Sequence, residues 1–270
     1  MSAELPVAAS GKDAIAVARA CAAEARRLTR AAFGHAGVAA TKGRGNVVTQ
    51  VDLDVERTVT ELLRREFPDH PVLSEETAAT TRAEGWMWVI DPIDGTKNFS
   101  RGIPHFAFSL ALCFDAEPRL GLTLQPILDE EWLSVAGSGC RLNDIRVRVS
   151  NTETVAASVF AMDLGYDDRR AKGLIETALR LWPGMQSLRI PGSAALGLAY
   201  AAAGRYDIFV HLNLFPWDLA AGLLHVREAG GTITERDGRP ATIFSETAIA
   251  AAPAVHADFL RLAGAEGWQA

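Results

Sequence analysis

The sequence predicts a mixed α/β (α+β) protein, and three observations support this fold class. Apolar residues repeat at helical spacing near the N-terminus, short apolar runs with Gly and Pro follow, and strands alternate with helices in the second half. The chain of 270 residues is 49% hydrophobic and 22% charged, which is typical of globular proteins and excludes a disordered or fibrous chain. We therefore expect a substantial buried core.

Two amphipathic helices are expected first. In residues 13–33, apolar side chains recur every three or four positions, while the arginines fall on the other face. The same spacing in residues 52–67 predicts a second helix, which the prolines at 68 and 71 end. Each helix therefore has one face for the core.

Short strands are expected next, because the apolar runs there are bounded by Gly and Pro. They cover residues 72–73, 86–90, 106–114, 120–125 and 132–136. A polar stretch at residues 150–155 forms a soft boundary, and beyond it the two element types alternate. Strands are expected at residues 158–162, 186–190 and 206–212, and helices at residues 169–182, 194–203 and 219–228.

The charge and the cysteines restrict the class of protein. With 27 basic and 33 acidic residues the formal charge is −6, which argues against nucleic-acid binding. Cys21, Cys113 and Cys140 are too scattered for a disulfide framework, so a reducing compartment is expected. The N-terminus shows no basic segment followed by an apolar one, so no secretory signal is expected, and the uncharged stretch at residues 190–204 is shorter than a membrane span. We expect a cytoplasmic protein without a membrane or nucleic-acid partner.

The most informative segment is residues 88–99, where an apolar strand ends in acidic residues. Pro92 fixes the backbone so that the Asp91 and Asp94 carboxylates and the Ile93 carbonyl oxygen can converge. Hard oxygen atoms at this spacing suit Mg²⁺, and ligand sites often lie beyond the carboxyl ends of strands. An ordinary polar turn is the alternative, because Asp, Pro and Gly are common turn residues.

Further acidic residues favour the metal interpretation. Glu75 and Glu76 follow another short apolar strand, and Asp218 opens a helix. Asp218 could simply cap that helix, and the two glutamates could lie in a solvated loop. However, the flanks of these sites are apolar, and a buried carboxylate without a partner is costly. A shared cation would stabilise all of them.

Two long motifs in the sequence resemble the signatures of a known family. The string DPIDGTKNF at residues 91–99 and PWDLAAGLLHVREAGG at residues 216–231 closely resemble the two signatures of the inositol monophosphatase family. The likeness extends to Lys42, to Asn46 and to other motifs, and it covers about the whole chain. It implies a Mg²⁺-dependent, typically Li⁺-inhibited phosphomonoesterase, built as a layered αβαβα sandwich of the sugar-phosphatase type and assembled as a homodimer. One such domain is implied over residues 8–263, with a metal- and phosphate-binding half at 8–150 and an alternating half at 151–263 that closes the active site.

The resemblance also implies a set of metal ligands. Glu75, Asp91 and the Ile93 carbonyl oxygen would hold the first Mg²⁺, and Asp91, Asp94 and Asp218 would hold the second. A third, more weakly held ion would be bound to Glu75 through water molecules, so two to three ions are expected in each active site.

Catalytic and substrate-binding roles follow from the same resemblance. Thr96 and Asp52 would orient the nucleophilic water, with Glu75 as the third catalytic residue, and the backbone amides of Gly95 and Thr96 would bind phosphate. The other implied substrate-binding residues are Gly192, Ser193, Ala194, His211 and Asp218.

Two positions depart from the family pattern. His211 stands where many relatives carry a glutamate that contacts inositol hydroxyls, and it could bind substrate or serve as a structural residue. A lysine directly after Thr96, here Lys97, resembles the sequence pattern of the histidinol-phosphatase and nucleotide-phosphatase branches of the family. With Arg101 nearby it could attract a second anionic group of the substrate, or it could be a solvated cation.

Three functional hypotheses therefore stay open. The first is hydrolysis of a small sugar or cyclitol phosphate, such as myo-inositol 1-phosphate, by metal-activated water. The second is the same chemistry on histidinol phosphate, fructose 1,6-bisphosphate or 3′-phosphoadenosine 5′-phosphate. The third is a regulatory binding protein that retains the fold. In the first two the partner is a small phosphorylated metabolite.

Overall fold

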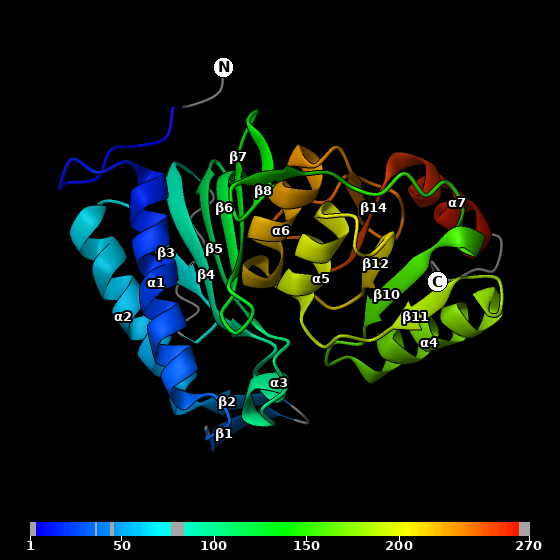
Figure 1. Ribbon diagram of the computed structural model, residues 1–270, viewed down its shortest axis with the longest axis horizontal. Helices are drawn as coiled ribbons and strands as arrows, with labels where there is room; N and C mark the ends of the chain where they lie inside the picture. Colours follow the sequence, from blue (N-terminus) through cyan, green and yellow to red (C-terminus); the bar gives the residue numbers. More distant parts are fainter. Residues whose placement is uncertain (1–3, 36, 44–45, 77–83, 265–270) are drawn as a thin grey trace.

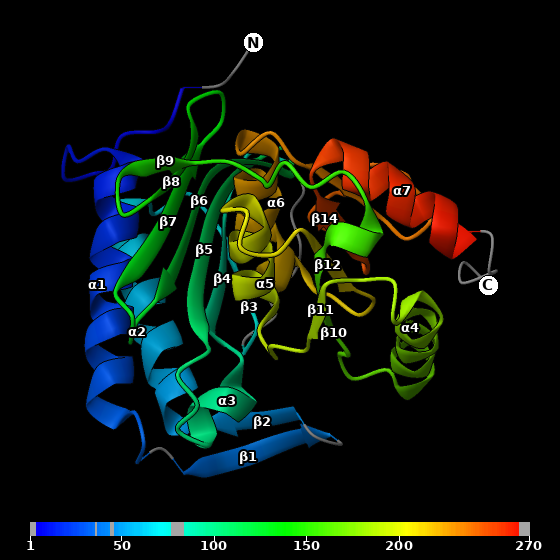
Figure 2. The same ribbon diagram turned by 45° about the vertical axis from the view of Figure 1, so that its right-hand side comes forward.

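Five layers of secondary structure stack along the length of the molecule (Figures 1 and 2). The computed structural model describes residues 4–35, 37–43, 46–76 and 84–264, and in this part of the chain the layers run helix, sheet, helix, sheet, helix. The helical layers are α1 (Ala14–Ala32) with α2 (Gln50–Glu66), α5 (Ala194–Ala202) with α6 (Pro216–Glu228), and α4 (Asp168–Leu181) with α7 (Pro253–Gly264). The expected αβαβα sandwich is confirmed.

Two sheets separate the helical layers. The larger follows chain order, with β3 (Val72–Ser74), β4 (Trp86–Asp94), β5 (Ala107–Phe114), β6 (Glu117–Gln125), β7 (Glu130–Val135), β8 (Gly139–Leu142) and β9 (Ile145–Val147). The smaller has the order β11 (Ser187–Arg189), β10 (Val159–Asp163), β12 (Ile208–His211), β14 (Ala248–Ala251) and β13 (Thr232–Thr234). Because β10 is parallel to both β11 and β12, the carboxyl ends of these strands share one edge.

Short elements complete the described chain. β1 (Val38–Gly43) and β2 (Asn46–Thr49) form an antiparallel hairpin, and α3 (Thr96–Ser100) packs against β2 (Figure 2). A 3-10 turn, η1 (Val155–Ala157), precedes the smaller sheet.

The larger sheet is covered by helices on both faces. Val17 of α1 and Val59 of α2 pack with Trp88 of β4, as their helical spacing predicts. On the other face α6 lies so close that a Cβ added to Gly121 would sit 3.0 Å from the carbonyl oxygen of Ala221. Only glycine allows this approach, which sets the distance between α6 and the sheet.

The central helix α6 is largely buried. A Cβ added to Gly222 would lie 2.5 Å from Cδ1 of Leu198, so α5 and α6 pack with almost no gap. His225 is fully buried, and its ring nitrogens lie 3.1 Å from the Thr123 hydroxyl and 2.8 Å from the Ser134 hydroxyl. Burial lowers the pKa of His225 to about 3, so the imidazole is neutral at pH 7.

Each helix and strand expected from the sequence overlaps an observed element. The strands β1, β2, β8, β9, β13 and β14 and the helix α7 were not predicted as elements. All three cysteines are buried and free, and no described helix has both the length and the apolar composition to cross a bilayer. The boundary expected at residues 150–155 lies between the strands of the two sheets, while the functional halves stay a prediction.

Candidate active site

A cavity of ≈ 220 Å³ opens where strand ends of both sheets meet helix N-termini. The carboxyl ends of β4, β10 and β12 contribute residues, as do the first turns of α3, α5 and α6. Nearly all residues expected at the site line this cavity, namely Glu75, Asp91, Ile93, Asp94, Gly95, Thr96, Gly192, Ser193, Ala194, His211 and Asp218. Asp52 lies behind this lining and contacts it through Thr96.

An irregularity in β4 brings two aspartates to the same side. Asp91 pairs with Ser109 of β5, whereas Asp94 pairs with Ala107, so β4 holds one extra residue between the two pairs. Residues three apart in a regular strand point to opposite faces, and one extra residue restores the same face. The bulge therefore directs both carboxylates toward the cavity.

Asp218 completes a cluster of three carboxylates. Ligand oxygens of Asp91, Asp94 and Asp218 all lie within 4.8 Å of one another. The other role considered for Asp218, a helix cap, is also real, because the backbone N–H of Phe215 donates to its Oδ2 at 2.8 Å. Asp218 therefore caps α6 and still faces the other two aspartates.

Glu75 lies beside the cluster because of strand register. β3 is parallel to β4, and Ser74 pairs with Ile90, so Glu75, the first residue after β3, lies next to Asp91 of β4. Glu75 lines the cavity, but it does not belong to the group of oxygens within 4.8 Å. It is near enough for its charge to raise the pKa of Asp91.

The electrostatics of the cluster indicate a cation site. Asp91 is 1% exposed, and its Oδ1 atom has no hydrogen-bond partner among the described residues. Burial raises the pKa of Asp91 well above its usual range, and the charges of Glu75 and Asp94 raise it further. Two carboxylates about 5 Å apart repel by roughly 3 kcal/mol at an effective dielectric constant of about 20. A divalent cation would remove this repulsion and give the unpartnered oxygen a ligand role, so the residues fit such an ion.

Asp94 joins the cluster to the start of α5. The Ser193 hydroxyl donates to Oδ2 of Asp94, and so does the backbone N–H of Ala195, at 2.8 Å. The N–H of Ala194 lies 3.3 Å from Oδ1. Burial raises the pKa of Asp94, whereas these hydrogen bonds to the helix N-terminus oppose the rise.

The turn after β4 places Gly95 and Thr96 in the cavity lining. Gly95 has a φ angle of +91°, and a Cβ there would lie 3.0 Å from the carbonyl oxygen of Gly192. Both features require glycine. Thr96 then begins α3, and its hydroxyl lies 3.0 Å from Oδ1 of Asp52 and 2.9 Å from the carbonyl oxygen of Ile93.

Asp52 is held rigidly in the first turn of α2. Its Oδ2 accepts hydrogen bonds from the Thr49 backbone N–H, at 2.9 Å, and from the Thr49 hydroxyl. The side chain is completely buried, and this burial raises its pKa despite the hydrogen bonds. An aspartate in this state can accept a proton more readily than a surface carboxylate.

Asp163 is a cavity residue that the sequence analysis missed. It ends β10, and its two carboxylate oxygens accept hydrogen bonds from the backbone N–H groups of Gly192, at 2.6 Å, and Ser193, at 3.2 Å. Burial raises the pKa of Asp163 to about 7. The signal was available, because Asp163 directly follows the predicted strand at 158–162, just as Asp91 follows its strand.

His211 ends β12 and is 6% exposed in the cavity wall. Its Nδ1 accepts the backbone N–H of Asn213 at 3.1 Å, so the neutral ring carries its hydrogen on Nε2. Burial lowers the pKa of His211 to about 4. The residue thus has a structural bond and also borders the cavity as a neutral donor.

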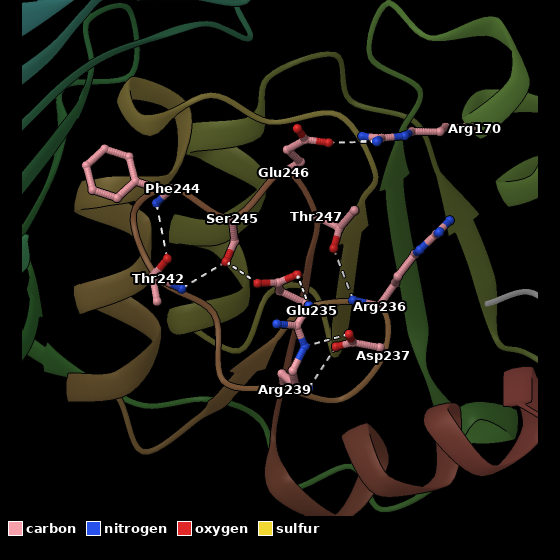
Figure 3. Close-up of polar contacts among 10 residues, drawn as sticks. All are labelled: Arg170, Glu235, Arg236, Asp237, Arg239, Thr242, Phe244, Ser245, Glu246 and Thr247. Carbon is pink, nitrogen blue, oxygen red and sulfur yellow. Dashed lines mark hydrogen bonds and ion pairs between the residues drawn. The ribbon is translucent and has the colours of Figure 1, made fainter. Parts of the chain in front are cut away.

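Arg170 and Glu246 support the chain next to His211, and Figure 3 shows this pair with the neighbouring polar contacts. Arg170 of α4 donates to the carbonyl oxygen of Leu212 at 3.1 Å and pairs with Glu246 at 2.6 Å. The backbone of Glu246 accepts the N–H of Leu214 at 2.8 Å, while Phe244 points away from the network. These contacts fix the segment between His211 and α6.

Apolar side chains line the outer part of the cavity, and they too were not expected from the sequence. They are Tyr166, Ile190, Phe215 and Trp217. The Lys97 ammonium group lies 4.7 Å from the centroid of the Tyr166 ring. These residues come from loops and helix starts, where no periodic pattern marks them. The side chains of Lys42 and Asn46 lie outside the described part of the structure.

Sequence comparisons agree with this geometry. The sequence profile described as the inositol monophosphatase family matches residues 12–266. The chain is 35% identical to the Nus factor SuhB of Pasteurella multocida over 81% of this chain and 83% of that protein. It is 37% identical to a fructose-1,6-bisphosphatase/inositol-1-monophosphatase of Thermotoga maritima over 82% and 83% of the two chains.

Solved structures show the same fold. The IMPase of Thermotoga maritima superposes with a TM-score of 0.86 at 32% identity, covering 94% of this chain and 98% of that one. The extragenic suppressor protein suhB from Bartonella henselae superposes with a TM-score of 0.86 at 33% identity, covering 92% and 97%.

Proposed function

Because this chain belongs to the inositol monophosphatase family, whose members are phosphoric monoester hydrolases, we propose that it uses Mg²⁺ to hydrolyse a small phosphorylated metabolite. One observation carries the proposal. Three carboxylates, Asp91, Asp94 and Asp218, converge within 4.8 Å in a cavity that also presents helix N-termini. Carboxylates alone would repel a phosphate, so the cavity is suited to phosphate only with cations bound.

The proposed ligand set follows the positions of the acids. Glu75, Asp91 and the Ile93 carbonyl oxygen would hold one Mg²⁺, and Asp91, Asp94 and Asp218 would hold another. Two to three ions per site are proposed. When bound, Mg²⁺ supplies charge neutralisation for the phosphate and the leaving oxygen and lowers the pKa of water.

The phosphate would bind at the turn after β4. Gly95 and Thr96 line the cavity at the start of α3, and their backbone N–H groups would bind the phosphate. Gly192 to Ala194 also line the cavity before α5, but their N–H groups already donate to Asp163 and Asp94. The phosphate would then lie between the acidic cluster and the two helix starts.

Thr96 and Asp52 would orient the attacking water. The Thr96 hydroxyl hydrogen points to Asp52 or to the Ile93 carbonyl oxygen, which leaves its lone pairs to accept a hydrogen from water. As the water oxygen bonds to phosphorus, the bond from phosphorus to the ester oxygen breaks, and the proton of the water can pass through the Thr96 hydroxyl to Oδ1 of Asp52. The departing ester oxygen takes up a proton from solvent, so the products are inorganic phosphate and the alcohol. The raised pKa of buried Asp52 suits it to this acceptor role.

The cellular form of the enzyme is also proposed. We infer that the protein is a cytoplasmic, Li⁺-sensitive homodimer, as the resemblance to the family implies. Support for a dimer comes from Ile175 and Leu179 of α4 and from Trp182, its C-cap residue, which repeat at helical spacing and are 37%, 66% and 52% exposed. Such an apolar stripe on a helix is typical of a protein interface.

A substrate panel tests the reaction. We would measure phosphate release with Mg²⁺ and with EDTA from myo-inositol 1-phosphate, histidinol phosphate, fructose 1,6-bisphosphate and 3′-phosphoadenosine 5′-phosphate. We expect turnover of at least one ester with Mg²⁺ and none with EDTA. Turnover in EDTA would contradict the proposed metal dependence. Ligand binding without turnover of any ester would instead favour a regulatory binding protein that keeps the fold.

A further inference from the structure

The outer part of the cavity differs chemically from its acidic floor. Tyr166, Ile190 and Phe215 line it and are 48%, 53% and 44% exposed. The rings of Phe215 and Trp217 stack with their planes 11° apart and their centroids 5.2 Å apart. This apolar surface lies at the opening of the cavity, next to the site proposed for phosphate.

Apolar side chains gathered in this way indicate a ligand contact. Single exposed apolar residues are common on proteins, but a contiguous group at a cavity opening marks a binding surface. The position of the group matters as well. Because the phosphate would bind at Gly95 and Thr96, the alcohol part of the ester would contact the rest of the lining, which includes Tyr166 and Phe215.

Outside the proposed metal ligands, the one carboxylate in the described lining is already engaged. Both carboxylate oxygens of Asp163 accept backbone N–H groups, and the Asn213 side-chain oxygen accepts the N–H of Tyr166 at 3.0 Å. Polar hydrogens also line the cavity, on the neutral His211 ring, the Lys97 ammonium group, the Asn213 amide and the Tyr166 hydroxyl. Among the described residues, the alcohol part therefore meets donors but no free carboxylate outside the proposed metal ligands.

We propose that the substrate is a phosphate monoester whose alcohol part carries a planar aromatic or heteroaromatic ring. The ring would lie against Tyr166 and the Phe215–Trp217 pair, with its polar edge toward the N–H of His211. The inference rests on the proposed phosphatase function and names the substrate class of the same cavity. Aromatic rings prefer such stacked and edge contacts, and these contacts add binding beyond the burial of area.

Lys97 fits the same substrate class. Its ammonium group lies over the Tyr166 ring at 4.7 Å from the centroid, so it holds this ring at the cavity opening. It also adds a positive charge at a cavity that receives a dianionic phosphate. A polyol would gain little binding energy from contact with the Tyr166 ring, because it has no aromatic ring to stack on it.

A matched pair of simple esters tests the proposal. We would compare kcat/KM with Mg²⁺ for benzyl phosphate, cyclohexylmethyl phosphate and myo-inositol 1-phosphate. The first two differ in the planarity of the ring while both release a primary alcohol. We expect kcat/KM for benzyl phosphate to exceed that for cyclohexylmethyl phosphate by about 3- to 10-fold, the size of an aromatic contact. It should also exceed the value for myo-inositol 1-phosphate.

Variants locate the effect in the cavity. Phe215→Leu and Tyr166→Leu should each reduce the benzyl-to-cyclohexylmethyl ratio of kcat/KM toward one. Phe244→Leu is the control, because Phe244 is 41% exposed and lies outside the cavity lining. It should leave the ratio unchanged. Using a ratio removes any general loss of activity caused by the substitutions.

The outcomes separate this inference from the proposed function. If none of the esters releases phosphate with Mg²⁺, the proposed function itself fails. If phosphate is released but myo-inositol 1-phosphate is preferred, the aromatic assignment is overturned while the phosphatase assignment stands. A ratio that neither variant lowers overturns it as well.

Discussion

The hydroxyl group of Ser193 donates a hydrogen bond to the carboxylate of Asp94, which ties the start of α5 to the end of β4. The two residues are 99 positions apart in the sequence. The oxygens of Asp94 accept hydrogen bonds from the N-terminus of α5 and also lie close to Asp91 and Asp218. The same contact joins the larger sheet to the central helical layer at the cavity.

Removing the charge of Asp94 should abolish the reaction. We expect Asp94→Asn to lower kcat/KM roughly 100-fold or more, because even residues that only support metal ligands are worth about 10- to 100-fold. Phosphate release with Mg²⁺ measures the effect. The control is Glu117→Gln. Glu117 is half-exposed and lies far from the cluster, because it pairs with Phe114 at one end of β5, whereas Asp94 pairs with Ala107 at the other end. Full activity in Asp94→Asn would refute the metal assignment.

Neutralising Asp91 should stabilise the metal-free protein. Its buried Oδ1 has no partner among the described residues, and its neighbours repel its charge. We expect Asp91→Asn to raise the Tm measured in EDTA by about 2–4 °C for each kcal/mol of repulsion removed. We also expect that Mg²⁺ raises the Tm of the wild type but not that of the variant. Thermal unfolding with EDTA and with Mg²⁺ measures both. Asp13→Asn should change neither, because Asn caps α1 as well as Asp does. A lower Tm in EDTA would contradict the prediction.

Asp163 should act through the position of Gly192 and Ser193. In Asp163→Asn one backbone N–H faces an amide N–H₂ instead of an oxygen, so we expect a loss of about 1–3 kcal/mol in stability and a raised KM. The matched control is Asp207→Asn. Asp207 accepts the N–H of Val159 at 2.6 Å, at the opposite end of β10. We expect Asp207→Asn to lower the stability of the protein without raising KM. Equal KM changes in both variants would show that Asp163 is only structural.

The pH dependence of stability should report on His225. Its pKa is lowered to about 3 in the folded protein, and an unfolded histidine titrates near 6.5. The stability that neutral His225 contributes is therefore complete above pH 6.5 and is lost progressively as the pH falls toward 3. From pH 8 to pH 5 the wild type should lose roughly 2 kcal/mol relative to His225→Gln. Urea unfolding of both proteins in EDTA tests this. A constant difference would contradict it.

The acidic part of the site could be predicted because its aspartates lie at the end of a strand that is recognisable in the sequence. Asp91 and Asp94 follow an apolar run, with Pro92 between them and Gly95 directly after them. The helix at Ala14–Ala32 was equally clear, because its apolar positions have regular spacing and Asp13 caps it. Local physics determines both features, so local sequence reveals them.

Other parts depend on contacts that local sequence does not show. Tyr166 and Phe215 lie about fifty residues apart, and only the pairing of β10 with β12 brings their segments to one cavity. The strand β14 (Ala248–Ala251) is a short alanine-rich run, whose apolar residues could equally begin a helix. Its place between β12 and β13 decides the matter. Tertiary packing therefore determines these elements more than propensity does.

The exposed stripe on α4 should control assembly. Leu179 is 66% exposed at the centre of a row with Ile175 and Trp182. We expect Leu179→Lys to convert a dimer to a monomer, because a lysine ammonium group buried in an apolar interface has no partner there. Lysine near the C-terminus of a helix does not itself weaken the helix. Light scattering coupled to size-exclusion chromatography measures the mass. Leu128→Lys is the matched control, since Leu128 is 57% exposed in the turn between β6 and β7, and it should leave the mass unchanged. A dimer that survives Leu179→Lys would place the interface on another face.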